Sequence, residues 1–173
     1  EKLNYVNFYG NLIKLADSYL VEILDALDDT GQTDDTVVIR TADHGEMGLA
    51  HRMQQKNFNF YEESARIPLV YSNPQLFGSA RTSDQLVSHL DLLPTLATLV
   101  EAPDAALSED WRGVDYSGLV LGTSTSAVQD DVLFTYDHWA AGQSNGPYIR
   151  PPNHRVAARV DLRHFVPLIG ANP

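Results

Sequence analysis

The sequence predicts an α/β fold, and three consecutive features near its N-terminus support that prediction. Apolar residues recur at three- and four-residue steps from Leu3 to Leu27, as in a long amphipathic helix. Residues 28–31 then supply a helix stop, because Gly31 suits the left-handed position that follows a helix. The β-branched run at residues 36–41 indicates a strand covered on both faces, as in a parallel sheet. Helix, short loop and buried strand together form half of an α/β repeat.

The rest of the chain contains four further predicted elements and two long loops. Apolar runs and periodic apolar residues predict strands at residues 67–71, 132–136 and 155–160, and a helix at residues 89–100. Asp91 and Pro94 fall in the opening turn of that helix, where an acidic residue and a proline are tolerated. Residues 42–59 and 139–153 have no regular period and contain several glycines, so we expect loops there.

Composition restricts the classes of function that are open to the chain. Its 173 residues fit one domain, 43% of them are hydrophobic, and the formal net charge is −11. Because 12 basic residues stand against 23 acidic ones, no nucleic-acid partner is expected, and no apolar run is long enough to span a membrane. The absence of cysteine excludes disulfides, thiolate metal sites and a cysteine nucleophile from these residues, and it leaves the cellular compartment open.

Asp43, His44 and Gly45 follow directly after the first predicted strand. In open α/β sheets, ligands bind beyond the carboxyl ends of the strands. Asp43 offers a hard oxygen, His44 offers an imidazole nitrogen, and Gly45 allows a tight turn, so this group could bind Ca²⁺, Mn²⁺ or Zn²⁺. The alternative is that Asp43 and His44 cap a turn, because an Asp-His pair alone is a weak signal.

Several other polar residues lie close to this group in the sequence. Lys56 would place a positive charge near a strand-end pocket, where it could hold an anion, and the alternative is a solvated surface lysine. His51 is a second candidate for the pocket, and its alternative is a hydrogen-bonded imidazole in a loop. Glu46 is interpreted as a surface acid, whereas Glu62 and Glu63 are expected to orient the next strand.

These segments follow one another in a characteristic order. Residues 36–47 are similar to a strand that ends at a metal-binding aspartate, and His51, Lys56 and residues 61–69 continue the match. Residues 87–96 are similar to a helix motif that follows the next strand, and residues 112–115 match a glycine-containing segment more loosely. Together they resemble the C-terminal part of the catalytic domain of the sulfatase family, in the alkaline phosphatase-like superfamily. The resemblance runs from about residue 5 to residue 122.

The resemblance implies a partial alkaline phosphatase-like three-layer sandwich with a mostly parallel sheet. Residues 1–173 would form the C-terminal portion of a sulfatase catalytic domain. Sulfatases use a formylglycine nucleophile that is made from Cys or Ser in a Cys/Ser-x-Pro/Ala-x-Arg motif, and this motif does not occur here. We therefore expect the nucleophile and the other metal-binding aspartates in a missing N-terminal half of the same protein. That half is also expected to bind this chain as a partner.

The resemblance also implies roles for individual residues. Asp43 and His44 look like two metal ligands, with Ca²⁺ as the first expectation and Mn²⁺ or Zn²⁺ as alternatives. Many sulfatases have Asn where His44 stands, and His occurs in the branch that resembles choline sulfatases and phosphonate monoester hydrolases. Lys56 resembles the lysine that binds the sulfate group, and His51 resembles a histidine that faces the substrate near the leaving group.

The activity implied by this resemblance is hydrolysis of a sulfate ester of a small molecule or a glycan. One alternative is a phosphonate monoester or phosphodiester hydrolase of the same superfamily, because both esters are tetrahedral anions. Another is a non-catalytic binding module that kept the fold. The isolated chain is expected to be inactive, and removal of half the sheet would favour a homo-oligomer because it leaves strand edges and apolar faces uncovered.

Overall fold

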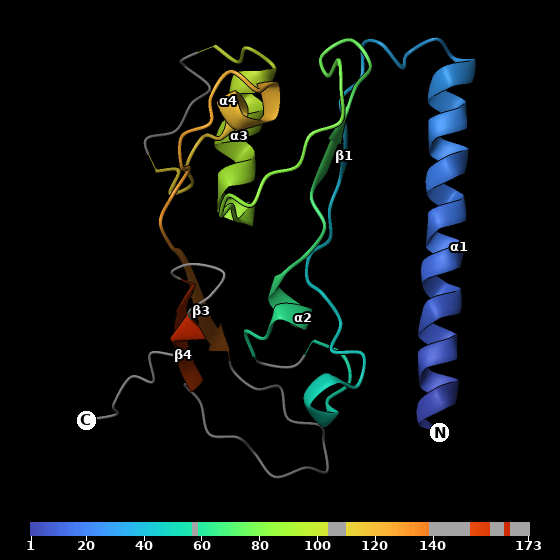
Figure 1. Cartoon of the computed structure of the whole chain (residues 1–173), viewed down its shortest axis with the longest axis vertical. Helices are drawn as coiled ribbons and strands as arrows, with labels where there is room; N and C mark the ends of the chain where they lie inside the picture. The colour runs from blue at the N-terminus through green and yellow to red at the C-terminus, as the bar shows by residue number, and fades with distance from the viewer. Residues whose placement is uncertain (57–58, 104–109, 139–152, 160–164, 167–173) are drawn as a thin grey trace. The chain divides into compact units, whose positions relative to one another are not determined.

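The computed structural model describes residues 1–56, 59–103, 110–138, 153–159 and 165–166, and it divides the chain into two compact units (Figure 1). The first unit, Glu1–Ala80, contains α1 (Lys2–Asp29), β1 (Val38–Arg40), the 3-10 helix η1 (Ala50–Arg52), α2 (Glu62–Ala65) and β2 (Val70–Ser72). The second unit, Arg81–Pro173, contains the 3-10 helix η2 (His89–Asp91), α3 (Leu92–Leu99), α4 (Ser117–Leu121), β3 (Val132–His138), β4 (Asn153–Arg159) and β5 (Phe165–Val166). The predicted helices and strands are confirmed in this order, whereas the loop predicted at residues 139–153 lies almost wholly outside the described residues.

The strands of each unit pair in an antiparallel manner. β1 pairs with β2, with Ile39 opposite Tyr71, and β3, β4 and β5 form a second sheet in that order. The mostly parallel sheet predicted from the sequence is therefore not found among the described strands. The β-branched run that suggested a strand covered on both faces is only half-buried, with Arg40 exposed. In a parallel sheet both faces of a strand are covered, and neither face of β1 is covered in this way.

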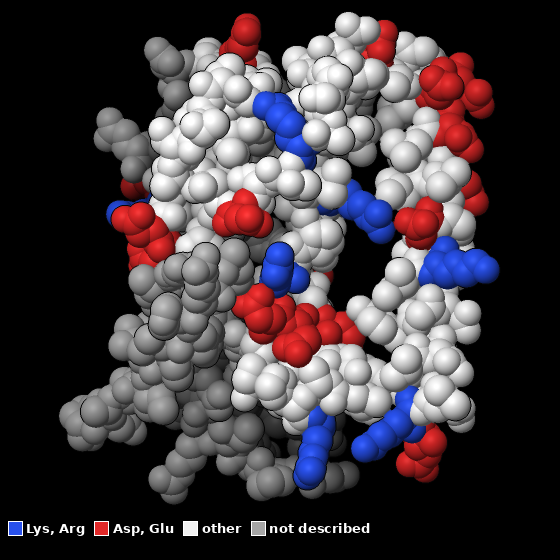
Figure 2. Space-filling model, in the orientation of Figure 1, with Lys and Arg blue, Asp and Glu red and all other residues white. Residues whose placement is uncertain are grey.

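The long N-terminal helix α1 ends where the sequence predicts. Gly31 adopts a φ of 66°, in the left-handed region, and its N–H donates to the carbonyl oxygen of Asp28 at 2.9 Å. No residue of α1 is buried, and the side chains of Leu3 and Phe8 are 70% and 63% exposed. In Figure 2, acidic side chains gather along the C-terminal half of α1 beside broad uncharged stretches. The described residues thus leave apolar surface of α1 uncovered, and none of their helices has the length and apolar character needed to cross a membrane.

A buried carboxylate, Asp91, connects three segments of the second unit. It is 2% exposed, and its oxygens accept hydrogen bonds from Ser88 N, Val114 N and Gln129 Nε2 at 2.6, 2.7 and 2.8 Å. Thr95 extends the network, because its hydroxyl donates to the Asp91 carbonyl oxygen at 2.7 Å. The motifs at residues 87–96 and 112–115 therefore meet at this carboxylate and have a structural role in this unit.

Asp91→Ala should destabilise the protein strongly, since it leaves three donors without their acceptor in a buried position. Hydrogen bonds to a charged group contribute about 1.5–3 kcal/mol each, so we expect a loss of about 3 kcal/mol or more in the free energy of unfolding. Urea unfolding measures this loss, with Asp84→Ala, at an exposed residue of the same unit, as the control. Equal unfolding midpoints for the two variants would contradict the structural role of Asp91.

Candidate functional site

The Asp43–His44 pair lies in the turn that follows β1. The His44 N–H donates to Asp43 Oδ1 at 3.0 Å, and His44 Nε2 lies 3.2 Å from Asp43 Oδ2. The carboxylate and the imidazole therefore face one another. Both are open to solvent, with the side chains 84% exposed for Asp43 and 38% exposed for His44. The structure thus brings together the two residues that the sequence singles out as metal ligands.

The side chains of this pair carry atoms that could bind a metal ion. His44 Nδ1 lies 2.8 Å from the carbonyl oxygen of Gly45, so a proton on Nδ1 can be donated there while Nε2 keeps its lone pair. Nε2 and Oδ2 lie 3.2 Å apart, so both atoms could approach the same cation. No group of three or more His, Asp or Glu side chains suited to a metal occurs in the described residues. Asp43 and His44 could therefore supply only two of the donors that a metal site needs.

Gly45 lets α2 pack directly against this turn. Its N–H donates to the carbonyl oxygen of Ser64 at 2.9 Å. A Cβ at this position would lie 2.0 Å from the carbonyl oxygen of Glu63, so any side chain would force the backbones apart. The glycine is needed for this close approach, and the approach brings α2 next to the two candidate metal ligands.

Glu46 organises the loop that follows the turn. Its Oε1 accepts hydrogen bonds from Gly48 N at 3.2 Å, from Gln55 N at 2.7 Å and from the hydroxyl of Tyr5 on α1. Burial opposes ionisation of this carboxyl, but the hydrogen bonds from Tyr5, Gly48 and Gln55 prevail, and the pKa of Glu46 is lowered. The same contact with Glu46 raises the pKa of Tyr5. Glu46 is a half-buried acid, and its carboxylate has a structural role that the sequence did not indicate, because it closes the loop between residues 48 and 55.

The loop closed by Glu46 has an unusual backbone. Positive φ values, between 51° and 75°, occur at Leu49, His51, Arg52 and Gln55. Residues other than glycine rarely adopt such values. Such conformations cost free energy and are retained mainly at functional sites. The positive φ values therefore make residues 49–55, which contain His51 and end next to Lys56, a candidate functional segment.

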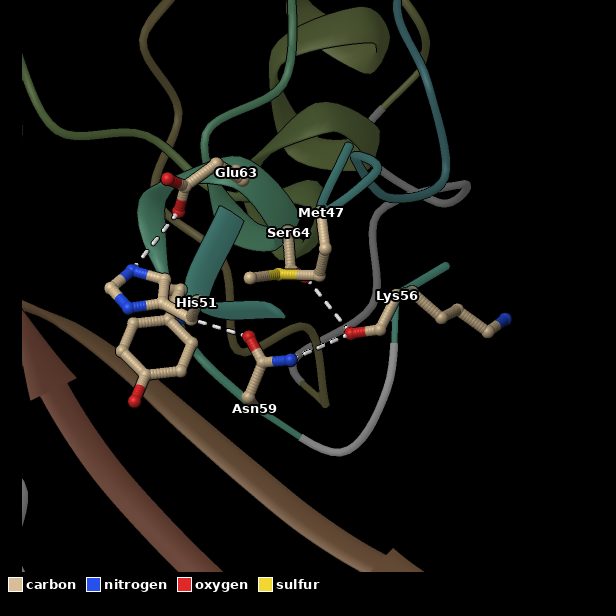
Figure 3. A network of polar contacts seen from close by, with 7 residues as sticks. Met47, His51, Lys56, Asn59, Glu63 and Ser64 are labelled. Atoms are coloured by element: carbon tan, nitrogen blue, oxygen red, sulfur yellow. Dashed lines mark hydrogen bonds and ion pairs between the residues drawn. The ribbon is translucent and has the colours of Figure 1, made fainter. Parts of the chain in front are cut away.

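His51 packs between an aromatic ring and a carboxylate. Its ring stacks on that of Tyr61, with centroids 4.0 Å apart and an angle of 15° between the planes. His51 Nε2 lies 3.9 Å from Glu63 Oε2, and Figure 3 shows this ion pair. The His51 side chain remains 48% exposed, so one side of it can reach a substrate. Tyr61 and Glu63 were not identified as site residues from the sequence, and only their place in the ordered motifs could have indicated them.

Lys56 is anchored through its backbone and extends its side chain away from the anchor. Its carbonyl oxygen accepts hydrogen bonds from Ser64 Oγ and Asn59 Nδ2, both at 2.9 Å (Figure 3). The ammonium group forms no ion pair within the part of the chain that the structure describes. His51 and Lys56 are thus connected through residues 59–64, whereas no hydrogen bond or ion pair between described residues joins Lys56 to Asp43 or His44.

Comparison with known proteins places these residues in a family context. The family model described as Sulfatase matches residues 1–102. Arylsulfatase K of Xenopus laevis is 31% identical over 139 residues, which is 80% of this chain and 25% of that protein. The chain therefore spans about a quarter of the length of this relative.

Solved structures agree with this match. A structure described as a 2-O GAG sulfatase superposes with a TM-score of 0.76 at 23% identity, over 92% of this chain and 32% of that one. The phosphonate monoester hydrolase of Agrobacterium radiobacter superposes with a TM-score of 0.61 at 30% identity, over 70% of this chain and 24% of that one. These neighbours support an alkaline phosphatase-like fold for the region that the chain covers.

Proposed function

The chain belongs to the sulfatase family, and we propose that it forms the C-terminal part of the active site of a metal-dependent enzyme that hydrolyses sulfate esters. The observation that carries this proposal is the Asp43–His44 pair, whose donor atoms lie 3.2 Å apart inside the segment that matches the family. The relatives include an arylsulfatase, at 31% identity, and a Delta 4,5-hexuronate-2-O-sulfatase, at 32% identity. We therefore propose a sulfate ester of a small molecule or a glycan as the substrate.

Asp43 and His44 would hold the metal ion. A carboxylate suits Ca²⁺, which is the first candidate, and the imidazole nitrogen also suits Mn²⁺ or Zn²⁺. When bound, the cation polarises the oxygens of the ester and favours an ionised nucleophile. The formylglycine nucleophile and the remaining ligands would come from the N-terminal part of the same protein, so this chain alone would be inactive.

Two other residues of the chain would act on the substrate. The ammonium group of Lys56, which no described carboxylate neutralises, would bind the sulfate oxygens and stabilise the charge that develops on them. The half-exposed imidazole of His51 would lie near the leaving alcohol and give it a proton. Residues 59–64, which bind the Lys56 backbone and contact the His51 ring, would keep both groups in place.

The uncovered surfaces of the first unit support the proposal of a larger domain. The apolar residues of α1 are largely exposed, and β1 is only half-buried. Additional strands and helices from the N-terminal part would cover them, and the complete domain would be a three-layer sandwich with a mostly parallel sheet.

A second candidate function is the hydrolysis of phosphonate monoesters. It is favoured by the 30% identity with the phosphonate monoester hydrolase structure and by a histidine at position 44. A phosphonate monoester and a sulfate ester present similar anionic oxygens to Lys56 and to the metal. The residues of this chain would therefore serve either reaction.

Paired substrates distinguish these functions. The complete enzyme, loaded with Ca²⁺, Mn²⁺ or Zn²⁺, is assayed with an aryl sulfate and an aryl phosphonate that carry the same phenol. We expect a higher kcat/KM for the sulfate. A higher value for the phosphonate would favour the second candidate, and no turnover of either with any of the three metals would favour a binding module.

A further inference from the structure

Building on the proposed function, we propose that Tyr61 and Glu63 are positioning residues that hold His51 in the orientation from which it protonates the leaving alcohol. Tyr61 directly precedes the short helix α2, and Glu63 lies in its first turn. The two side chains contact the His51 ring from different sides. Glu63 would thus have a second role besides the orientation of the next strand, which the sequence predicts.

The two contacts restrain different movements of the ring. The Tyr61 ring lies nearly parallel to the imidazole at 4.0 Å, so it fixes the plane in which His51 lies. The Glu63 carboxylate lies 3.9 Å from Nε2, so it favours the rotation of the ring that turns Nε2 toward it. A ring restrained in both respects has one preferred orientation, with Nε2 toward Glu63 and Nδ1 on the opposite side.

The Nδ1 atom of His51 is available for chemistry. Within the described residues this atom forms no hydrogen bond, and the side chain is 48% exposed. As an oxygen of the upstream nucleophile bonds to sulfur, the bond between sulfur and the alcohol oxygen breaks, and its electron pair goes to that alcohol oxygen. The proton on Nδ1 moves to the same oxygen and the alcohol leaves, while His51 becomes neutral.

The backbone supports the same orientation. His51 has a φ of 51° and a ψ of 20°, a left-handed conformation that is unfavourable for histidine. The conformation is retained next to the loop closure by Glu46, and in it the ring lies on Tyr61. Strain of this kind is characteristic of residues that must present a side chain in one direction.

Substitution of the two side chains should leave α2 in place. The position of α2 depends on backbone and neighbouring groups, because Asn59 Oδ1 accepts from Tyr61 N at 3.0 Å and Ser64 O accepts from Gly45 N at 2.9 Å. The Ser64 hydroxyl also donates to the carbonyl oxygen of Lys56. None of these bonds uses the Tyr61 ring or the Glu63 carboxylate, so variants at these positions report on His51.

The dependence of rate on the leaving group tests this proposal. We would measure kcat/KM of the complete enzyme for aryl sulfates whose phenols range from nitrophenol to unsubstituted phenol. Glu63→Gln should lower the value for phenyl sulfate by about 10–100-fold and leave that for nitrophenyl sulfate nearly unchanged, because only a poor leaving group needs the proton. Tyr61→Leu should have the same effect, whereas Tyr61→Phe should restore the wild-type dependence because it keeps the stacked ring.

Glu62→Gln is the matched control, since it removes the same charge from the adjacent residue of α2, whereas the ion pair of His51 is with Glu63. A uniform loss for all substrates in Glu63→Gln, or no loss for any, would overturn the positioning role while wild-type turnover still supports the proposed function. A wild-type enzyme that hydrolyses none of the sulfates would overturn both.

Discussion

Asp43→Ala should abolish most metal binding and activity of the complete enzyme. Asp43 supplies the carboxylate of the candidate metal pair, and its removal leaves His44 Nε2 without the oxygen that lies 3.2 Å away. Residues that only support a metal ligand typically contribute 10–100-fold to metal affinity, so loss of a ligand itself should weaken binding by at least about 100-fold. Metal content after gel filtration, and kcat for an aryl sulfate at fixed metal concentration, measure this effect.

Two further variants show whether the effect comes from the ligand atom. Asp25→Ala removes an exposed acid from α1, on the same unit, and should keep wild-type metal content and turnover. Asp43→Asn keeps an oxygen but removes the charge, so it should bind metal more weakly than the wild type and more tightly than Asp43→Ala. If Asp43→Ala retains the metal content and kcat of the wild type, Asp43 is not a ligand.

Periodicity was sufficient to predict the elements of the fold, because it is a local property of the sequence. The apolar spacing from Leu3 to Leu27 and the glycine at position 31 predict α1 and its end, and both are confirmed. The direction in which strands pair depends on residues far apart in the chain. The apolar run of β1 carries no information about its partner, and it pairs with β2 in an antiparallel manner.

The candidate site was predictable only in part, because some of its contacts join residues that lie far apart in the chain. Asp43 and His44 are neighbours in the sequence, so their proximity in space follows almost directly. The role of Glu46 in closing the loop was not predicted, because it depends on donors at positions 5, 48 and 55, one of which lies 41 residues away on α1. Likewise, no spacing rule relates His51 to a ring ten residues later, and the stack occurs in a loop whose backbone is left-handed at His51.

Lys56→Ala should lower kcat/KM of the complete enzyme for an aryl sulfate by about 10²–10³-fold, corresponding to about 3–4 kcal/mol of transition-state stabilisation. The lysine backbone is held by Ser64 and Asn59, so the substitution removes the charge without removing its support. Inorganic sulfate should also inhibit the variant more weakly, because the ammonium group binds the same oxygens. Lys14→Ala, at an exposed position of α1, is the control. A Lys56→Ala enzyme with wild-type kcat/KM and sulfate inhibition would show that the sulfate group is bound by other residues.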